Sequence, residues 1–95
     1  NESELAAYWY EVWLVHWEAM NFMRDEVLMQ PIRHSMYQLK NYLPNDLVQA
    51  LESLDDDFDQ CLMEGEELIL NRLAGMKQTG LVMLNIGQWL NKQTA

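Results

Sequence analysis

The segment from residue 5 to residue 23 carries more large apolar side chains than one face of a helix can hold. Its apolar residues, which include three of the chain's four tryptophans, are Leu5, Tyr8, Trp9, Tyr10, Val12, Trp13, Leu14, Val15, Trp17, Met20, Phe22 and Met23. A surface helix normally has an apolar stripe about 100° wide, whereas here only Glu11, Glu18 and Asn21 form a polar strip. We therefore expect a helix that is central to the fold or lines a binding groove.

The composition is typical of one globular domain. The chain has 95 residues, of which 49% are hydrophobic and 22% are charged. Fifteen acidic residues against six basic ones give a net charge of −9, which repels phosphate backbones, so no nucleic-acid partner is expected. No apolar run reaches the roughly 18 residues of a membrane span.

Cysteine content and the start of the chain support three further expectations. Cys61 is the only cysteine, so no internal disulfide can form, and a small buried apolar residue is favoured over a catalytic thiol. The lack of a signal-peptide layout favours a cytoplasmic protein. The chain begins at Asn1 rather than Met, as expected of a domain from a longer chain, a processed chain or an engineered sequence.

Apolar periodicity predicts four helices and no strand, over residues 3–23, 29–43, 46–74 and 80–91. Asn1 or Ser3 can cap the first helix, and Pro44 ends the second because the residue before a proline is biased away from helix. Short connections place consecutive helices antiparallel. The predicted fold is therefore all-α, an antiparallel up-down-up-down four-helix bundle that forms a single domain over residues 1–95.

Single residues set the expected limits of the last two helices. Asn45 is expected to cap the third helix, and Gly75 is expected to end it, one turn past its last strong apolar position. Thr79 then caps a short fourth helix, and residues 91–95 are expected to fray. Gly65 falls on the apolar stripe of the third helix, where we expect a close approach of two helices.

An acidic run suggests a calcium site as one interpretation. Counted from Asp55, a calcium-binding loop would take oxygen ligands from Asp55, Asp57 and Asp59, and a bidentate carboxylate from Glu66. The sixth position should be glycine for the sharp turn, but it is Gln60. An acidic, solvent-exposed face of a long helix is therefore the favoured interpretation, and no metal site is expected.

Residues arranged for catalysis are not evident in the sequence. Neither His16 nor His34 has the Glu-x-x-His spacing of carboxylate-bundle metal sites. A glycine-rich phosphate loop, a nucleophile triad and a CxxC pair are also missing from the sequence. We therefore expect a non-catalytic protein without a cofactor.

The aromatic surplus of the first helix leaves two interpretations open. In one, the chain is a purely structural or engineered bundle, all four tryptophans are buried, and no cleft separates the first and fourth helices. In the other, a groove between these helices, where Trp89 lies, takes a small apolar ligand, a lipid or a partner peptide. Surplus apolar surface could also drive homo-association.

Two short motifs resemble the FKBP–rapamycin-binding (FRB) domain of TOR-type kinases. Trp-Tyr-Glu-Val-Trp at residues 9–13 is similar to that domain's Trp-His-Glu-Met-Trp opening. Leu-Met-Glu-Gly at residues 62–65 is similar to the Leu-Met-Glu-Ala of its long third helix. The separation of the motifs and the chain length also agree. The resemblance implies a four-helix bundle beside a kinase active site, with a groove between the first and fourth helices for macrolides or lipids.

Carried over by position, the resemblance assigns groove residues to two helices. On the side of the first helix they are Trp17, Asn21, Arg24 and Asp25. On the fourth helix the residue is Asn85, or Trp89 if that helix shifts by one turn. Arg24 and Asp25 replace apolar aromatics of the family, and Asn21 stands where the family has a small serine. Burying an unmet polar group costs about 1–3 kcal/mol, so the resemblance implies a divergent or redesigned member with weakened macrolide binding.

Overall fold

The computed structural model describes residues 1–63 and 73–94, which form helices and no strand. The α-helices are α1 (Glu2–Met23), α2 (Met29–Leu39), α3 (Asn45–Met63) and α4 (Leu73–Thr94). Two short 3₁₀ helices, η1 (Glu26–Leu28) and η2 (Lys40–Tyr42), flank α2. The predicted all-α class is confirmed, with four helices packed together. None of the described helices is long and apolar enough to cross a membrane.

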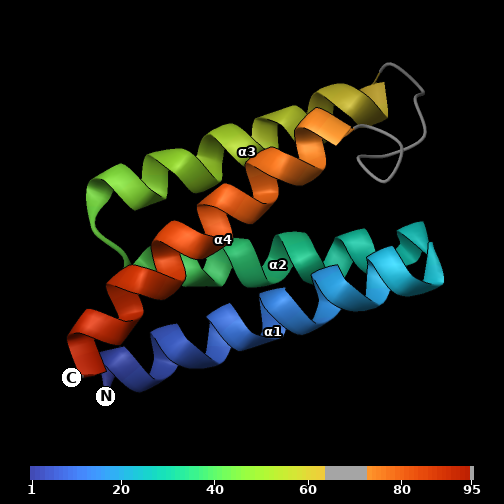
Figure 1. Ribbon diagram of the computed structural model, residues 1–95. Helices are drawn as coiled ribbons and strands as arrows, with labels where there is room; N and C mark the ends of the chain where they lie inside the picture. The colour runs from blue at the N-terminus through green and yellow to red at the C-terminus, as the bar shows by residue number, and fades with distance from the viewer. Residues whose placement is uncertain (64–72, 95) are drawn as a thin grey trace.

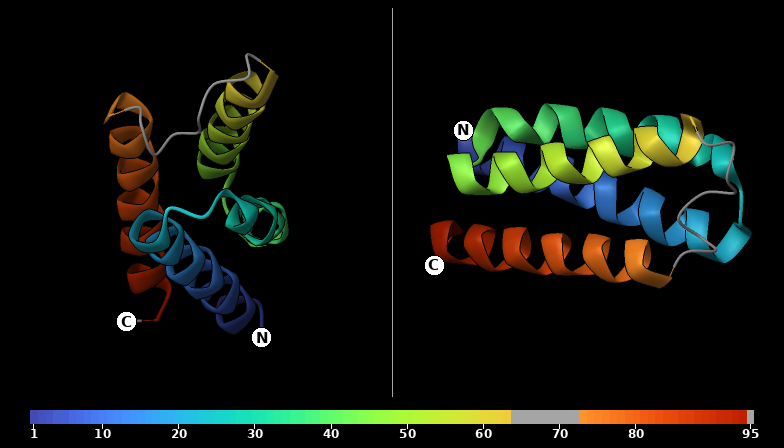
Figure 2. Two further views of the ribbon diagram at one scale, coloured as in Figure 1. Left: turned by 90° about the vertical axis from the view of Figure 1, so that its right-hand side faces the viewer. Right: turned by 90° about the horizontal axis from the view of Figure 1, so that it is seen from above.

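Helix α1 lies between α2 and α4 (Figure 2) and packs against both. In Figure 1, α2 runs alongside α1, α3 lies beside α4, and both chain termini are at the same end of the molecule. The side chain of Trp17 also stacks on Phe58 of α3, with the ring centroids 6.3 Å apart. Helix α1 therefore contacts all three of the other helices, as expected of a helix central to the fold.

Both ends of α1 follow from local hydrogen bonds. The Asn1 side chain accepts a hydrogen bond from the Glu4 backbone N–H at 2.9 Å, and the Glu4 carboxylate in turn lies 3.4 Å from the Asn1 amino group. This reciprocal capping box satisfies two N-terminal donors of the helix. At the other end Arg24 adopts a left-handed conformation, φ 54°, and its N–H donates to the Met20 carbonyl at 2.7 Å. Asn1, rather than Ser3, is therefore the cap.

The second helix ends earlier than its apolar pattern predicts. Helix α2 stops at Leu39, and η2 follows it over Lys40–Tyr42, instead of one regular helix over residues 29–43. Leu43 is extended, with φ −108° and ψ 154°, because it precedes Pro44. The chain therefore leaves the helix through a tighter 3₁₀ turn.

The last two helices have different limits from those predicted. Helix α3 already begins at Asn45, because the Pro44 carbonyl accepts hydrogen bonds from the N–H groups of Leu47 and Val48, at 3.1 and 3.0 Å. Asn45 is therefore inside the helix rather than its cap. The predicted continuation of this helix over 64–72, with Gly65, lies outside the described residues.

Helix α4 begins at Leu73 rather than at residue 80 and reaches Thr94 rather than 91. Residues 73 and 74 therefore belong to α4, and neither Gly75 nor Thr79 marks a helix end. A glycine inside a helix costs only about 1 kcal/mol, which packing can offset. Thr79 is fully buried inside α4, near the end of its second turn, rather than at a cap position.

All four helices contribute to one hydrophobic core. Its buried members are Ala6, Trp13, Trp17 and Met20 of α1, Met29, Ile32, Met36 and Leu39 of α2, Leu51, Leu54 and Phe58 of α3, and Val82, Met83, Ile86 and Leu90 of α4. Leu43, Leu47 and Trp89 pack against this core while remaining partly exposed. The edge of the core therefore reaches the surface near the chain termini.

Candidate binding cleft around Trp89

Trp89 lies half-buried on the last part of α4, between two hollows of the surface. The first hollow has a volume of about 420 Å³ and lies between the start of α1, residues 41–44 and α4. The second has a volume of about 470 Å³ and lies between the start of α3 and α4. Pro44 and Trp89 line both hollows. We call these two residues and the two hollows that they share the Trp89 cleft.

The Trp89 cleft is lined by apolar, polar and charged residues, the charged ones being Glu2, Asp46 and Lys92. Leu43 and Leu47 join Pro44 and Trp89 as apolar lining. The polar lining includes four side-chain amides, those of Asn41, Asn85, Gln88 and Gln93. An amide carries both donors and an acceptor. The cleft can therefore take an apolar group against Trp89 and hydrogen-bond to polar atoms beside it.

The turn at Pro44 shapes one wall of the cleft. The chain turns abruptly from η2 into α3 because Leu43 is extended and the Pro44 carbonyl accepts the first hydrogen bonds of α3. The ring of Pro44 holds its own φ near −65°, so this wall is set by the backbone rather than by a flexible side chain. The sequence predicts Pro44 as a helix end, but it carries no signal that Pro44 is part of a site.

A third hollow, of about 320 Å³, lies further along the contact between α1 and α4. The Tyr10 hydroxyl, which lines it, donates a hydrogen bond to the Met83 carbonyl at 2.9 Å. A Cβ atom on Gly87 would lie 2.7 Å from this hydroxyl oxygen, so glycine allows Tyr10 to lie across α4. Burial raises the pKa of the Tyr10 hydroxyl, and the negative charge of Glu11 raises it further.

The residues assigned to a groove by the FRB resemblance do not gather in one place. Asn85 and Trp89 line the same hollow. Trp17 is only 7% exposed and stacks on Phe58, so it belongs to the core rather than to an open groove. Neither hollow of the Trp89 cleft is lined by Trp17, Asn21, Arg24 or Asp25.

The other three residues assigned to the groove beside the first helix have local roles, and only Asn21 of them lies within α1. The Asn21 side-chain amide donates to the Trp17 carbonyl at 2.9 Å. Its oxygen is buried without a hydrogen-bond partner among the described residues. Arg24 forms the left-handed end of α1, and the Asp25 carboxylate accepts a hydrogen bond from the Val27 N–H at 3.1 Å.

The four tryptophans differ in exposure. Trp13 and Trp17 are buried, whereas Trp9 and Trp89 are partly exposed. The ring of Trp9 meets His34 of α2 edge-on, with centroids 5.6 Å apart. The purely structural interpretation predicted that all four tryptophans are buried, and that prediction is wrong.

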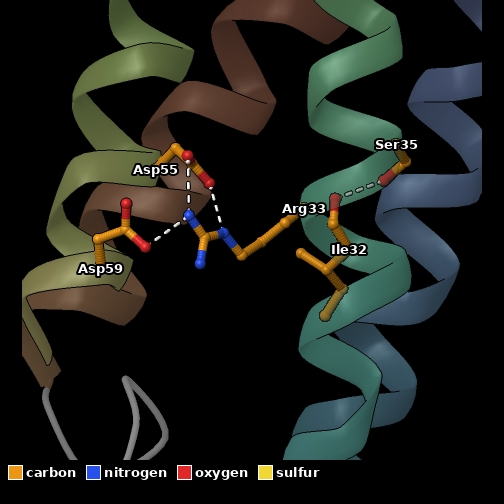
Figure 3. Close-up of polar contacts among 5 residues, drawn as sticks. All are labelled: Ile32, Arg33, Ser35, Asp55 and Asp59. Carbon is orange, nitrogen blue, oxygen red and sulfur yellow. Dashed lines mark hydrogen bonds and ion pairs between the residues drawn. The ribbon is translucent and has the colours of Figure 1, made fainter. Parts of the chain in front are cut away.

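The acidic run does not form the loop that a calcium site would need. Residues 55–63 continue α3 as a regular helix. Arg33 of α2 reaches across to this helix (Figure 3): its Nε and Nη2 donate to the two carboxylate oxygens of Asp55 at 2.7 and 3.0 Å, and Nη2 lies 2.7 Å from Asp59 Oδ1. The hydrogen bonds to Asp55 are the main cause of a raised pKa of the guanidinium.

Two predicted calcium ligands are thus occupied by a cation of the chain itself. Asp57 is exposed, and Glu66 lies outside the described residues. Among the residues that the structure describes, no cluster of three potential metal ligands occurs. The acidic run is one face of α3, which Arg33 joins to α2. It does not have the geometry of the calcium-binding loop that was the alternative interpretation.

No protein-family model, curated protein or solved structure matches this chain. The resemblance to the FRB domain therefore stays a prediction.

Proposed function

We propose that this chain is a non-catalytic binding module whose Trp89 cleft takes a short segment of a partner peptide. The observation that carries the proposal is the half-buried indole of Trp89 between two hollows of about 420 and 470 Å³. Binding sites for small ligands typically have volumes of about 300–1,000 Å³ and combine apolar walls with a few polar groups. Aromatic residues such as tryptophan are also enriched among the residues that dominate binding energy.

The four amides of the cleft favour a peptide over a lipid or a purely apolar ligand. A peptide segment carries backbone N–H and C=O groups, which lose hydrogen bonds to water on binding. Amide side chains around an apolar centre can replace those bonds. A lipid chain would gain nothing from them and would leave amide groups without partners if it covered them.

The proposal includes the FRB-like arrangement, with consecutive helices running in alternate directions. The short connection over residues 24–28 and the two termini at one end of the molecule support it. Within that arrangement, recognition is placed at the Trp89 end of α4 rather than beside Trp17, because Trp17 stacks on Phe58. We accordingly expect rapamycin not to change the tryptophan fluorescence of the chain. A saturable change would support the groove beside Trp17 that the FRB resemblance implies.

Nuclear magnetic resonance of the four indole N–H groups tests the proposed site. The probe is N-acetyl-phenylalaninamide, which joins one apolar side chain to two amides, and toluene serves as the apolar control. We expect N-acetyl-phenylalaninamide to shift the Trp89 indole and the side-chain amides of Asn85 and Gln88. The shifts of the two side-chain amides should disappear in Trp89→Ala and persist in Trp9→Ala, which removes the other partly exposed indole.

Two results would contradict this proposal. If the probe at high millimolar concentration leaves the Trp89 signal unchanged, the cleft does not recognise an apolar side chain. If toluene reproduces the same shifts with equal affinity, the amides do not contribute, and the site is one for small apolar ligands.

A further inference from the structure

The side of α1 that faces away from the core carries a second line of apolar residues. These are Leu5, Tyr8, Val12, Val15, Ala19 and Phe22, which we call the outer seam. Phe22 is 90% exposed, Tyr8 57%, Val15 52% and Leu5 46%, whereas Val12 and Ala19 are partly buried. Other residues of α1, namely Ala6, Trp13, Trp17 and Met20, pack in the core. The packing of the four described helices therefore does not explain why the outer seam is apolar.

The spacing of the outer seam is that of a coiled coil. Successive members are three, four, three, four and three residues apart, which is the a/d heptad pattern by which one helix packs along another. From Leu5 to Phe22 the seam extends over about 26 Å, at 1.5 Å per residue. Helix α1 is unbroken over this length and is closed by a capping box, so it presents a preformed surface.

The charge beside the outer seam is equally regular. Glu4, Glu11 and Glu18 recur at intervals of seven residues, all three are exposed, and they occupy the flanking g position of the same heptads. Charges at flanking positions of a coiled coil select the partner and its orientation. A row of glutamates therefore selects a helix that carries lysine or arginine along the matching edge.

We propose that the outer seam of α1 docks one basic amphipathic helix of another protein. Charge complementarity carries this choice of partner, because the glutamate row and the net charge of −9 both attract cationic segments. The same charges disfavour a second copy of this chain and an anionic membrane surface. The seam lies on a different face from the Trp89 cleft, so this docking is independent of the function proposed above.

A peptide-binding experiment with matched charge tests the inference. The probe is a labelled peptide of three heptads with leucine at the a and d positions and lysine at both flanking positions, and its control has glutamate at the flanking positions. Fluorescence anisotropy and amide-shift mapping follow the binding to the full chain. We expect the lysine peptide to bind, to shift α1 residues along the outer seam and to weaken with salt, and the glutamate peptide not to bind.

Variants of the chain separate the apolar from the charged contribution. Val15→Gln is expected to weaken the lysine peptide about tenfold or more, because it replaces an apolar side chain at the centre of the seam. Leu84→Gln, which replaces an exposed leucine of α4, should leave the affinity unchanged. The pair Glu11→Gln with Glu18→Gln should weaken binding more than Asp56→Asn with Asp57→Asn, which removes the same charge from α3.

The possible outcomes either support or overturn the proposal. Equal binding of both peptides, or unchanged binding by Val15→Gln, would overturn it. Shifts that map to α3 or α4 instead of α1 would also overturn it. A dimer in sedimentation that dissociates in Val15→Gln would show that a second copy occupies the seam, and binding to anionic vesicles lost in the same variant would show that a membrane does.

Discussion

Two glycines of α4 offer a matched pair of substitutions that tests how α1 packs on α4. A Cβ atom on Gly80 meets no atom within 4 Å, whereas a Cβ atom on Gly87 lies 2.7 Å from the Tyr10 hydroxyl oxygen and 3.3 Å from Tyr10 Cζ. Both glycines lie inside the same helix, so the change in helix propensity is nearly the same for both. Any difference between Gly80→Ala and Gly87→Ala therefore reports the contact with Tyr10.

The expected magnitudes follow from this geometry. Gly80→Ala should raise the free energy of unfolding by about 0.5–1 kcal/mol, because alanine is the better helix former. Gly87→Ala gains the same amount, but it displaces the Tyr10 hydroxyl and loses its hydrogen bond to Met83, worth about 0.5–1.5 kcal/mol. Crowding adds at least about 1 kcal/mol. The two variants should thus differ by roughly 2 kcal/mol.

Urea unfolding followed by circular dichroism measures both variants, alone and with Tyr10→Phe. Removing the hydroxyl leaves Cζ as the nearest ring atom to the new methyl group, so the penalty of Gly87→Ala should fall by about 1 kcal/mol in the Tyr10→Phe background. Stabilisation of the chain by Gly87→Ala to the same extent as by Gly80→Ala would contradict this expectation. A penalty of the same size with and without the Tyr10 hydroxyl would refute it as well.

Three further perturbations have defined outcomes. The pKa of Tyr10 in the folded chain is raised above 10.0, so the protonated hydroxyl contributes to the free energy of unfolding below pH 10, and this contribution is lost as the pH rises through the folded pKa. Urea unfolding from pH 8 to 11 should therefore show a decline in the free energy of unfolding that Tyr10→Phe lacks. Arg33→Lys removes the two hydrogen bonds that the guanidinium donates to Asp55. Since both groups are partly exposed, it should lower the free energy of unfolding by about 0.5–1 kcal/mol. This loss should be smaller in 1 M salt, and a loss of the same size in salt would contradict an electrostatic contribution. Millimolar calcium should leave the melting temperature unchanged, whereas a rise would revive the acidic run as a metal site.

The features that the sequence predicts well are those decided by neighbouring residues. An amide three residues before a glutamate favours Asn1 over Ser3, the other predicted cap of the first helix. Pro44 predicts that the chain has left the helix by Leu43, although the regular helix already ends at Leu39. Both are local effects of backbone hydrogen bonds and sterics. The all-α class follows in the same way from apolar periodicity along single segments.

The limits of α4 depend on packing and could not be predicted in that way. Gly75 and Thr79 have the residue types of a helix end and a helix cap, but both lie within α4. Thr79 is buried by the packing of α4 against the rest of the fold. Such tertiary packing can outweigh differences in helix propensity of about 1 kcal/mol. A single sequence carries no direct record of that burial.

The sequence alone does not fix which face of α1 points into the core. The resemblance to the FRB domain implies that Trp17 lies in a groove, whereas Trp17 is buried with Ala6, Trp13 and Met20. On a helix with apolar residues around most of its circumference, the inward face is decided by its neighbours, here α2 and α4. Of the expected groove residues, Asn85 and Trp89 line a common hollow, because both lie on one helix.

Helix α1 has two separate apolar faces, one packed in the core and one open to solvent. Paramagnetic relaxation of side-chain signals by an inert soluble probe measures this directly. We expect strong broadening of the signals of Tyr8, Val15 and Phe22, whereas those of Trp13 and Met20 should be protected. Equal protection of both sets, or broadening at Trp13 and Met20 instead, would contradict it.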